Sequence, residues 1–185
     1  MTHEDVLAFW FADGPGVRRE VWFKRTDAFD TACGEFRAVL TAALRGDLNG
    51  WSTTPRGALA LVIVLDQLPR NIDRGTPKAF SGDAAALAIA AAAISTGFDR
   101  ALLPVERVFL YLPFEHSEDL ADQDRSVALF EALAGEPDMA LTIDYAHRHR
   151  DVIRRFGRFP HRNPILGRTN SAAENAYLAE PGAGF

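Results

Sequence analysis

The chain has 185 residues, enough for one domain with a substantial core, and its 48% hydrophobic and 24% charged residues argue against disorder. A net charge of -5 argues against nucleic acid or an anionic membrane as a partner. Cys33 is the single cysteine, which excludes an internal disulfide and fits the cytoplasm, where we expect the protein. The N-terminal stretch does not resemble a signal peptide, and the apolar segments 58–65 and 84–94 are too short to cross a bilayer.

The N-terminal quarter of the chain is predicted to form two helices. Thr2 and Asp5 have the spacing of a capping box, so a helix should cover about 3–12. Thr26 should cap a second helix that continues to about Arg45, with Cys33 as a small core residue on its apolar face.

The third predicted helix, which opens at Thr54, is apolar on all sides over residues 58–65 and should be buried. Asp66 falls on the same side as several of these apolar residues, and a buried carboxylate needs a partner. Arg70 lies four residues further on and can pair with Asp66 if the helix continues past Pro69.

The rest of the chain is also predicted to be helical, with no segment of alternating polarity typical of a strand. The expected fold is all-α, with about eight helices in a single domain, 1–185. The remaining helices are expected from Ser81 to Thr96, from Pro104 to just before Pro113, from Ser117 to Ala134, from Asp138 to Arg155 and from Ser171 to Leu178.

The acidic run SEDLADQDRS is predicted to turn partly toward the interior. Helical geometry places Asp124 and Glu131 outside, whereas Asp122 lies close to the inward face, with Glu118 at its flank. Gln123 falls beside inward apolar residues. This run therefore differs from an ordinary solvated acidic face.

An apolar stripe along the helix 138–155 has a histidine in its middle. The stripe is formed by Leu141, Tyr145, Val152 and Phe156. His149 falls within it, whereas His147 is expected on the opposite, exposed side. A histidine on an apolar face is more often a satisfied core residue than a ligand, and both interpretations of His149 stay open.

Residues 148–168 contain seven arginines and a single acidic residue, Asp151, in a chain that is acidic overall. Arginine side chains bind carboxylates and phosphates through two parallel hydrogen bonds. The arginines either form an anion pocket for a ligand or pair internally with the carboxylates of Asp66, Glu115, Glu118 and Asp122.

The common catalytic motifs are missing from the sequence. There is no G-x-G-x-x-G, Walker A, G-x-S-x-G or H-E-x-x-H motif, and one cysteine excludes a thiolate zinc site. The sequence assigns no metal and no cofactor. A carboxylate–histidine metal site made of His149 or His116 with Asp66, Glu118 or Asp122 is the weaker alternative.

Three long blocks give the sequence a family resemblance. They are LDQLPRNIDRGTPKAF, LPFEHSEDLADQDRSVALF and HRDVIRRFGRFPHRNPILGR. Together with the N-terminal VLAFWF and WFKRTDAFD, they resemble the bacterial family catalogued as domain of unknown function 924 over essentially the whole chain. The resemblance implies an all-α fold similar to tetratricopeptide-repeat proteins and little about activity. Its blocks coincide with the inward polar residues Asp66, Arg70, Asn71, His116, Glu118, Asp122 and the segment 158–163.

The first functional hypothesis is a central pocket that holds a small anionic ligand. Hydrolysis of a small ester, amide or phosphate would use a histidine or a carboxylate of raised pKa. The candidate catalytic residues are Asp66, His116, Asp122 and His149. The candidate ligand-binding residues are Gln67, Arg70, Asn71, Glu118, Gln123, Arg158, His161, Arg162 and Asn163. This hypothesis predicts that Asp66 and His149 lie near each other in a cavity.

The second hypothesis is a tetratricopeptide-repeat-like interaction module that binds a peptide or protein in a groove. The polar blocks would then be structural ion-pair networks, and exposed Trp10, Trp22 or Trp51 would mark the partner surface. Buried ion pairs are poor pure stabilisers, since packed apolar residues often serve as well. This weakness of buried ion pairs as stabilisers favours the pocket hypothesis over the interaction module.

Overall fold

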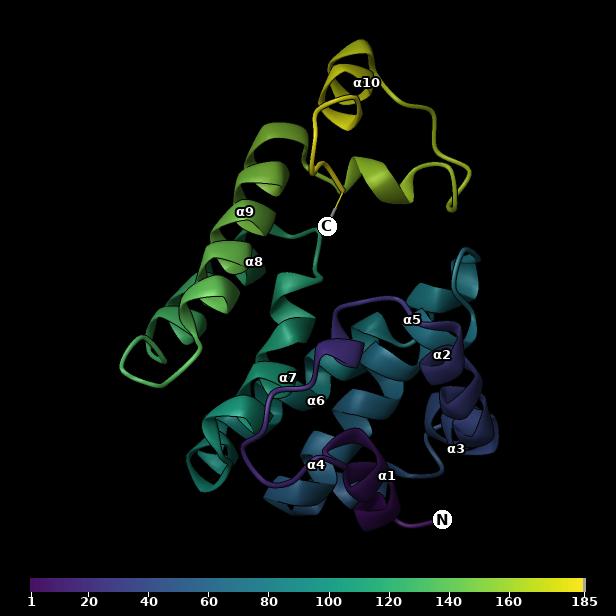
Figure 1. The fold of residues 1–185 in the computed structure, drawn as a ribbon, viewed down its shortest axis with the longest axis vertical. Helices are drawn as coiled ribbons and strands as arrows, with labels where there is room; N and C mark the ends of the chain where they lie inside the picture. Colours follow the sequence, from purple (N-terminus) through teal and green to yellow (C-terminus); the bar gives the residue numbers. More distant parts are fainter. Residues whose placement is uncertain (185) are drawn as a thin grey trace. The chain divides into compact units, whose positions relative to one another are not determined.

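A computed structural model describes residues 1–184, and these contain helices and turns but no strand (Figure 1). Two pairs of α-helical segments, α2 with α3 and α4 with α5, are joined by turns that continue the helix, so the ten segments form eight continuous helices. The prediction of an all-α fold with about eight helices is confirmed. Its similarity to tetratricopeptide repeats stays a prediction.

The α-helical segments are α1 His3–Trp10, α2 Asp27–Cys33, α3 Arg37–Leu44, α4 Pro55–Val62, α5 Leu68–Ile72, α6 Asp83–Ser95, α7 Pro104–Glu115, α8 Leu120–Glu131, α9 Ala140–Phe156 and α10 Ala172–Leu178. The short 3₁₀ segments are η1 Glu20–Trp22, η2 Gly34–Phe36, η3 Asn49–Thr53, η5 Pro77–Phe80, η6 Phe98–Ala101 and η7 Pro160–Arg162. The segment η4, Ile63–Gln67, is a π-helical turn.

The chain divides into two compact units, which are described separately below. Unit 1 contains residues 1–74 and 78–113, and unit 2 contains residues 75–77 and the chain from Phe114 onward. The single domain expected from the length stays a prediction.

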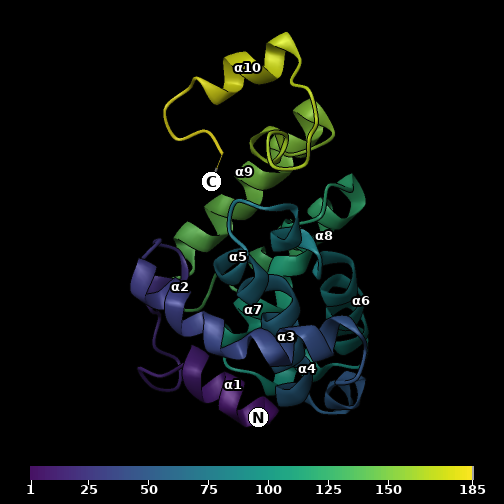
Figure 2. The same cartoon turned by 90° about the vertical axis from the view of Figure 1, so that its right-hand side faces the viewer.

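The core of unit 1 is built around α4. Every residue from Ala58 to Leu65 is at most 1% exposed, as the apolar run predicted. The helices α1 and α6 both pack against α4, and α1 lies beside it in Figures 1 and 2. The capping box of Thr2 and Asp5 is present at the start of α1.

Aromatic side chains fill the space beside α1 in unit 1. Trp10 and Trp22 are buried, and both rings contact the edge or face of Phe109, at centroid distances of 5.5 and 4.7 Å. Trp22 Nε1 also donates to the carbonyl of Trp10 at 3.0 Å. The expectation that Trp10 and Trp22 mark an exposed partner surface is therefore wrong, because both rings complete the core.

The α4 helix passes into α5 through the π turn η4. The amide of Leu68 donates to the carbonyl of Ile63, five residues back, and Pro69 takes the second position of α5. A proline is tolerated in the first turn of a helix, so the chain stays helical past Pro69. In a regular α-helix the residue at position 69 would donate its N–H to the carbonyl of Leu65, but proline has no N–H. The backbone of Gly82 packs closely against this carbonyl.

The alanine-rich helix α6 is part of the unit 1 core. The stretch Pro77–Ser95 is long and apolar enough to cross a membrane by length and composition alone. Its residues Ala86, Ala90 and Ala93, however, are buried, and α6 packs on α4 and η4. One side of α6 therefore packs on the core of unit 1, and 28% of the apolar stretch is buried.

Several predicted helix ends are wrong by up to a turn. The helix α7 continues through Pro113 to Glu115, because the buried residues on both sides of the proline keep the helix packed. The helix from Thr26 is tightened into 3₁₀ geometry at η2. Asp119, and not Ser117, caps α8 by accepting from two backbone amides of the first turn.

The core of unit 2 lies where α8 and α9 pack along each other. The buried side chains of α9 are Thr142, Ala146, His149, Val152 and Ile153. The predicted stripe is right at Val152 but wrong at its start: Leu141 is 53% and Tyr145 36% exposed. Phe159 is fully buried against Val152 and Ile153, and this small core is extended by Phe156 and Tyr177.

Candidate functional site

The first polar block, in unit 1, is an ion-pair network around a buried carboxylate. Asp66 is fully buried, and Arg70 Nη1 lies 3.3 Å from its Oδ1. The same guanidinium binds both carboxylate oxygens of Asp83 at 2.9 and 3.0 Å. Burial opposes the charged form of Arg70, but the two carboxylates hold its pKa above the ordinary value. Arg70 therefore joins η4 to the start of α6.

The neighbours Gln67 and Asn71 extend this network. Gln67 Nε2 donates to Asp66 Oδ2 at 2.6 Å, and Asn71 Nδ2 donates to the carbonyl of Gln67 at 3.0 Å. Asn71 also accepts from Arg74, which forms two hydrogen bonds with Asp30 of α2. The side chains of the first block thus hold elements of unit 1 together.

In unit 2, Glu118 and Arg168 clamp the backbone of Phe159. The Glu118 carboxylate accepts from the Phe159 amide at 2.8 Å, and Arg168 donates to both carboxylate oxygens at 2.7 and 2.9 Å. Arg168 also donates to the Phe159 carbonyl at 3.1 Å. Burial raises the pKa of Glu118, but these hydrogen bonds outweigh it and keep the pKa below its usual range. Glu118 is therefore a positioning residue for Phe159.

Arg158 and Asn163 are held within the segment that leads to α10. Arg158 donates to both oxygens of Glu174 at 2.6 and 2.8 Å and to the carbonyl of Thr169. The hydrogen bonds that Glu174 accepts from Arg158 and from the Ser171 amide lower its pKa to about 2. Asn163 is fully buried and donates to Asn170 Oδ1 at 2.7 Å.

Gln123 fixes the end of α7 in unit 2. This fully buried side chain donates through Nε2 to the carbonyls of Phe114, Glu115 and Ser117. Asp122 is half-buried and accepts from the hydroxyl of Ser117 at 2.7 Å. Both residues thus set the backbone of residues 114–117, which carries Glu115 and His116.

Four sequence candidates and one aromatic ring come together in unit 2, in what we call the Phe159 cluster. Its members are His116, His149, Phe159, His161 and Arg162. The ring of Phe159 lies 5.5 Å from that of His149 and 5.6 Å from that of His161, between centroids. The guanidinium of Arg162 stacks over Phe159 at 4.4 Å, and the His116 ring lies 6.5 Å from that of His149.

The Phe159 cluster contains a histidine of fixed orientation. His149 Nδ1 lies 2.8 Å from the Tyr145 carbonyl, which only accepts, so Nδ1 carries the proton and Nε2 is the basic nitrogen. Glu115 Oε1 is 3.3 Å from the same Nδ1 and is itself buried. Burial lowers the pKa of His149 to about 3, and the positive charge of Arg162 acts in the same direction.

Both guanidinium and carboxylate groups act on His161 in the Phe159 cluster. Burial and the neighbouring Arg162 together lower the pKa of His161 to about 4. Arg162 is buried, and the guanidinium of Arg168 adds to the positive field at His161. The Arg168 guanidinium is itself paired with Glu118, whose carboxylate acts on His161 in the opposite direction.

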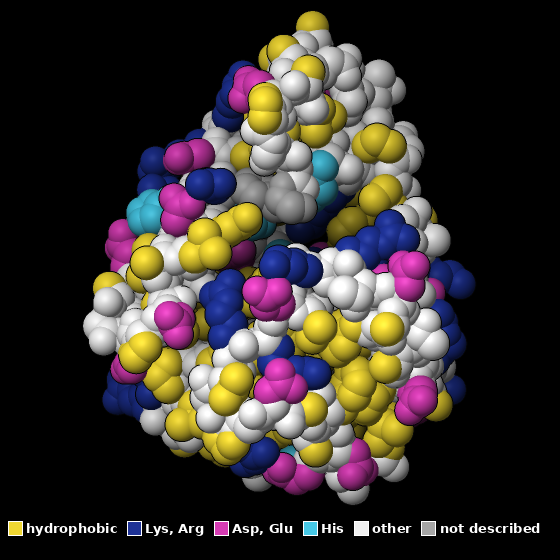
Figure 3. All heavy atoms as spheres, in the orientation of Figure 1, with side chains coloured by type: hydrophobic (Ala, Val, Ile, Leu, Met, Phe, Trp, Pro, Cys, Tyr) yellow, Lys and Arg dark blue, Asp and Glu magenta, His cyan; other side chains and the backbone are white. Residues whose placement is uncertain are grey.

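The arginine-rich segment thus divides into an outer and an inner set. On the exposed side of α9, Arg148 Nε lies 2.7 Å from Asp144 Oδ2, and Arg154 lies 3.8 Å from Asp124. Basic and acidic side chains are likewise interspersed on the face shown in Figure 3. Arg162 instead belongs to the buried Phe159 cluster.

Comparison with known proteins places this architecture in a family. The family model described as "Bacterial protein of unknown function (DUF924)" matches residues 6–182. The chain belongs to this family. The structure of a protein of unknown function, ATU0120 from Agrobacterium tumefaciens, is similar with a TM-score of 0.87 and 41% identity over 96% of both chains. No match was found among curated proteins.

Within this DUF924 chain the sequence candidates fall in both units. Asp66, Gln67, Arg70 and Asn71 belong to unit 1, whereas the other candidates belong to unit 2. The expected proximity of Asp66 and His149 therefore stays a prediction. Among residues 1–184 the structure shows no group of three or more histidine, cysteine, aspartate or glutamate side chains able to hold a metal ion.

Sequence reasoning missed several partners that organise the DUF924 site. Phe159 and Arg168 were not among the candidates, and neither Asp83 nor Glu174 was assigned a role. For Glu174 a signal existed, because Ser171 three residues earlier forms a capping box with it. The stacking of Arg162 on Phe159 depends on the turn at η7 and has no sequence signature of its own.

Proposed function

We propose that the protein binds a small carboxylate or phosphate at the Phe159 cluster. The observation that carries this proposal is the buried guanidinium of Arg162 over Phe159, beside three histidines on separate elements. Arginine is the side chain whose geometry matches a carboxylate or a phosphate through paired hydrogen bonds. The net charge of -5 argues against nucleic acid as the partner.

The reaction class proposed for this site is hydrolysis of a small ester, amide or phosphate. His149 supports it, because Tyr145 and Glu115 hold Nδ1 and leave Nε2 as the basic nitrogen. A negatively charged substrate bound beside His149 would raise the pKa of its imidazole from about 3 toward the working pH. The oriented imidazole would then accept a proton from water and return it to the leaving group, while Arg162 stabilises negative charge on the substrate. We propose a cytoplasmic location, supported by the single buried thiol of Cys33.

An interaction module of the tetratricopeptide-repeat type is our second candidate. The pairing of Arg70 with Asp66 and Asp83 supports a structural role for the first polar block. The burial of Trp10 and Trp22 weakens this candidate, since these rings were expected to meet the partner.

Binding of acetate and inorganic phosphate, measured by NMR chemical-shift titration, tests the proposal. Arg162→Ala should weaken binding about tenfold or more, as expected for the loss of a charge-assisted pair. Arg154→Ala removes a half-exposed guanidinium from the outer set and should leave the affinity unchanged. Arg162→Lys keeps the positive charge but lacks the paired donors, so it provides a second variant if Arg162→Ala fails to fold. Equal affinity in the wild type and in a folded Arg162 variant would overturn the proposal.

Catalysis is tested separately with nitrophenyl acetate and nitrophenyl phosphate. His149→Gln should abolish any hydrolysis but retain anion binding, because glutamine keeps a donor and loses the basic nitrogen. Unchanged turnover in His149→Gln would exclude His149 as the base.

A further inference from the structure

We infer that Asn49 is a site of spontaneous deamidation, at which the folded chain converts a side-chain amide into a carboxylate without an enzyme. Asn49 precedes Gly50, and the two residues open the 3₁₀ segment η3 in unit 1. Both residues are exposed. The reaction involves only the chain and water, so it does not depend on the ligand proposed for the Phe159 cluster.

The reaction uses the backbone nitrogen of the next residue as the nucleophile. The nitrogen of Gly50 loses its proton and attacks Cγ of Asn49, and Nδ2 of Asn49 takes up a proton and leaves as ammonia. Water then opens the cyclic imide at either of its carbonyl groups, which leaves aspartate or isoaspartate at position 49. Glycine favours the attack, because no Cβ stands beside its nitrogen and its backbone torsions are nearly unrestricted.

The atoms that react form no hydrogen bonds in the folded chain. Gly50 is the second residue of η3, and the first amides of a helix have no partner within it. Within residues 1–184, neither this N–H nor the side-chain amide of Asn49 has a hydrogen-bond partner. The hydroxyls of Ser52 and Thr53 donate only to the carbonyl oxygens of residues 49 and 50, at 2.7 and 2.9 Å.

The start of η3 can open far enough for the attack. Helical torsions keep the Gly50 nitrogen away from Cγ of Asn49, so the backbone at Asn49 has to rotate. An exposed 3₁₀ turn opens at a low cost in free energy, because its hydrogen bonds have poor geometry. No atom lies within 4 Å of the position that a Cβ on Gly50 would take, so this rotation meets no packed neighbour there.

A second asparagine in the chain, Asn170 of unit 2, is followed by a small residue but is protected. The N–H of Ser171, which would be the nucleophile, donates to Glu174 Oε2 at 2.6 Å. The side chain of Asn170 accepts from Asn163 at 2.7 Å and donates to Asn175 at 2.9 Å. The fold therefore holds both the nucleophile and the leaving group of this pair.

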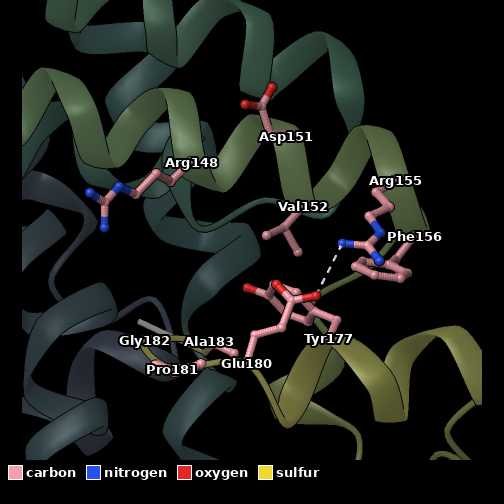
Figure 4. A pocket seen from close by; sticks show the side chains of 10 residues that line it. All are labelled: Arg148, Asp151, Val152, Arg155, Phe156, Tyr177, Glu180, Pro181, Gly182 and Ala183. Atoms are coloured by element: carbon pink, nitrogen blue, oxygen red, sulfur yellow. Dashed lines mark ion pairs between the residues drawn. The ribbon is translucent and has the colours of Figure 1, made fainter.

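The helix α10, which begins directly after Ser171, is also anchored. The ring of Tyr177 packs on Phe156 of α9 at a centroid distance of 5.2 Å, and the Arg155 guanidinium lies over both rings (Figure 4). The capping box of Ser171 and Glu174 thus belongs to a helix that is held on its neighbour. The structure distinguishes a reactive pair at 49–50 from a protected pair at 170–171.

Deamidation should loosen η3 from α4. The two segments pack against each other, and a Cβ on Gly57 of α4 would lie 2.1 Å from the carbonyl oxygen of Trp51. Isoaspartate adds a methylene group to the main chain two residues before Trp51, and such a close fit does not tolerate the added length. Hydrogen exchange in the first turn of α4 should therefore be faster in aged protein than in fresh protein.

Incubation of the folded protein in mildly alkaline buffer, followed by tryptic peptide mapping with mass spectrometry, tests the inference. The peptide 46–56 contains Asn49 as its only amide side chain. It should gain the mass expected when an oxygen replaces an NH group, several times faster than the peptide that contains Asn170. An unchanged peptide 46–56, or equal rates in the two peptides, would overturn the inference.

A variant and a change of solvent identify the cause of the reactivity. Gly50→Ala places a methyl group in open space, so the variant should fold as the wild type does and deamidate several times more slowly. In urea, the release of the Ser171 N–H should accelerate deamidation at Asn170 more than at Asn49. A folded Gly50→Ala variant that reacts as fast as the wild type, or equal acceleration of both sites in urea, would refute the selection of Asn49 by the fold.

Discussion

The surroundings of His149 decide its chemistry more than its residue type does. The Tyr145 carbonyl fixes which nitrogen carries the proton, and burial keeps the ring neutral. Cys33 illustrates the opposite outcome: burial raises the pKa of its thiol to about 12, so it is an inert core residue, as its place on an apolar face predicted.

We expect the stability of the protein to fall as the pH decreases below about 6.5, the ordinary histidine value. The folded state protonates His149 only near pH 3, whereas the unfolded chain takes up that proton near 6.5. The contribution of His149 to the free energy of unfolding should therefore be fully present above pH 6.5. It should fall by about 1.4 kcal/mol per pH unit between pH 6.5 and pH 3. In His149→Gln, urea unfolding should show a slope shallower by that amount. An unchanged slope would contradict the buried, neutral imidazole.

At the scale of elements, the sequence predicted the helices well and their ends poorly. The helix end predicted before Pro113 is wrong, since α7 passes through this proline. At Pro69, where the sequence left the outcome open, the chain stays helical. In both cases the neighbouring residues are buried, and tertiary packing outweighs the local preference of the chain. The π turn η4 has no sequence signature, because it depends on how α6 packs against it.

The close approach of Gly82 to η4 gives a prediction for this element. A Cβ on Gly82 would lie 2.1 Å from the carbonyl oxygen of Leu65, which is backbone in the buried core. Gly82→Ala should therefore lower the free energy of unfolding by roughly 1–3 kcal/mol, measured by urea denaturation.

Gly34 supplies the matched control. It has helical backbone angles, and no atom lies within 4 Å of the position that a Cβ would take, so Gly34→Ala should stabilise the protein by about 0.4–1 kcal/mol. A Gly82→Ala variant as stable as the wild type would show that η4 can move away from α6.

At the scale of the whole molecule, the sequence indicated which polar residues lie inside but not which of them pair with one another. Helical periodicity shows which side of a helix is buried, so Asp66, Gln123 and His149 were all expected inside, and all three are buried. Which buried groups pair depends on contacts between distant segments. The hydrogen bond that the Phe159 amide donates to Glu118, 41 residues away, could not be predicted from one sequence.

The two units should differ in their response to acid. Unit 2 contains His149 and His161, whose pKa values are lowered to about 3 and 4, whereas the only histidine of unit 1 is His3. On going from about pH 7.5 to about pH 5, hydrogen exchange corrected for its intrinsic pH dependence should accelerate in α8 and α9 more than in α4. Equal acceleration in both units would show that these histidines do not control the acid response.

The clamp of Glu118 and Arg168 has a consequence for how the chain resists unfolding. The two residues are separated by 50 positions, so their paired hydrogen bonds close a long loop within unit 2. Closing such a loop is the role that a disulfide takes in secreted proteins, and a chain with one cysteine has no such means. The cross-link formed by this ion pair is insensitive to reducing agents and is weakened by acid, which protonates the carboxylate and removes half of the pair.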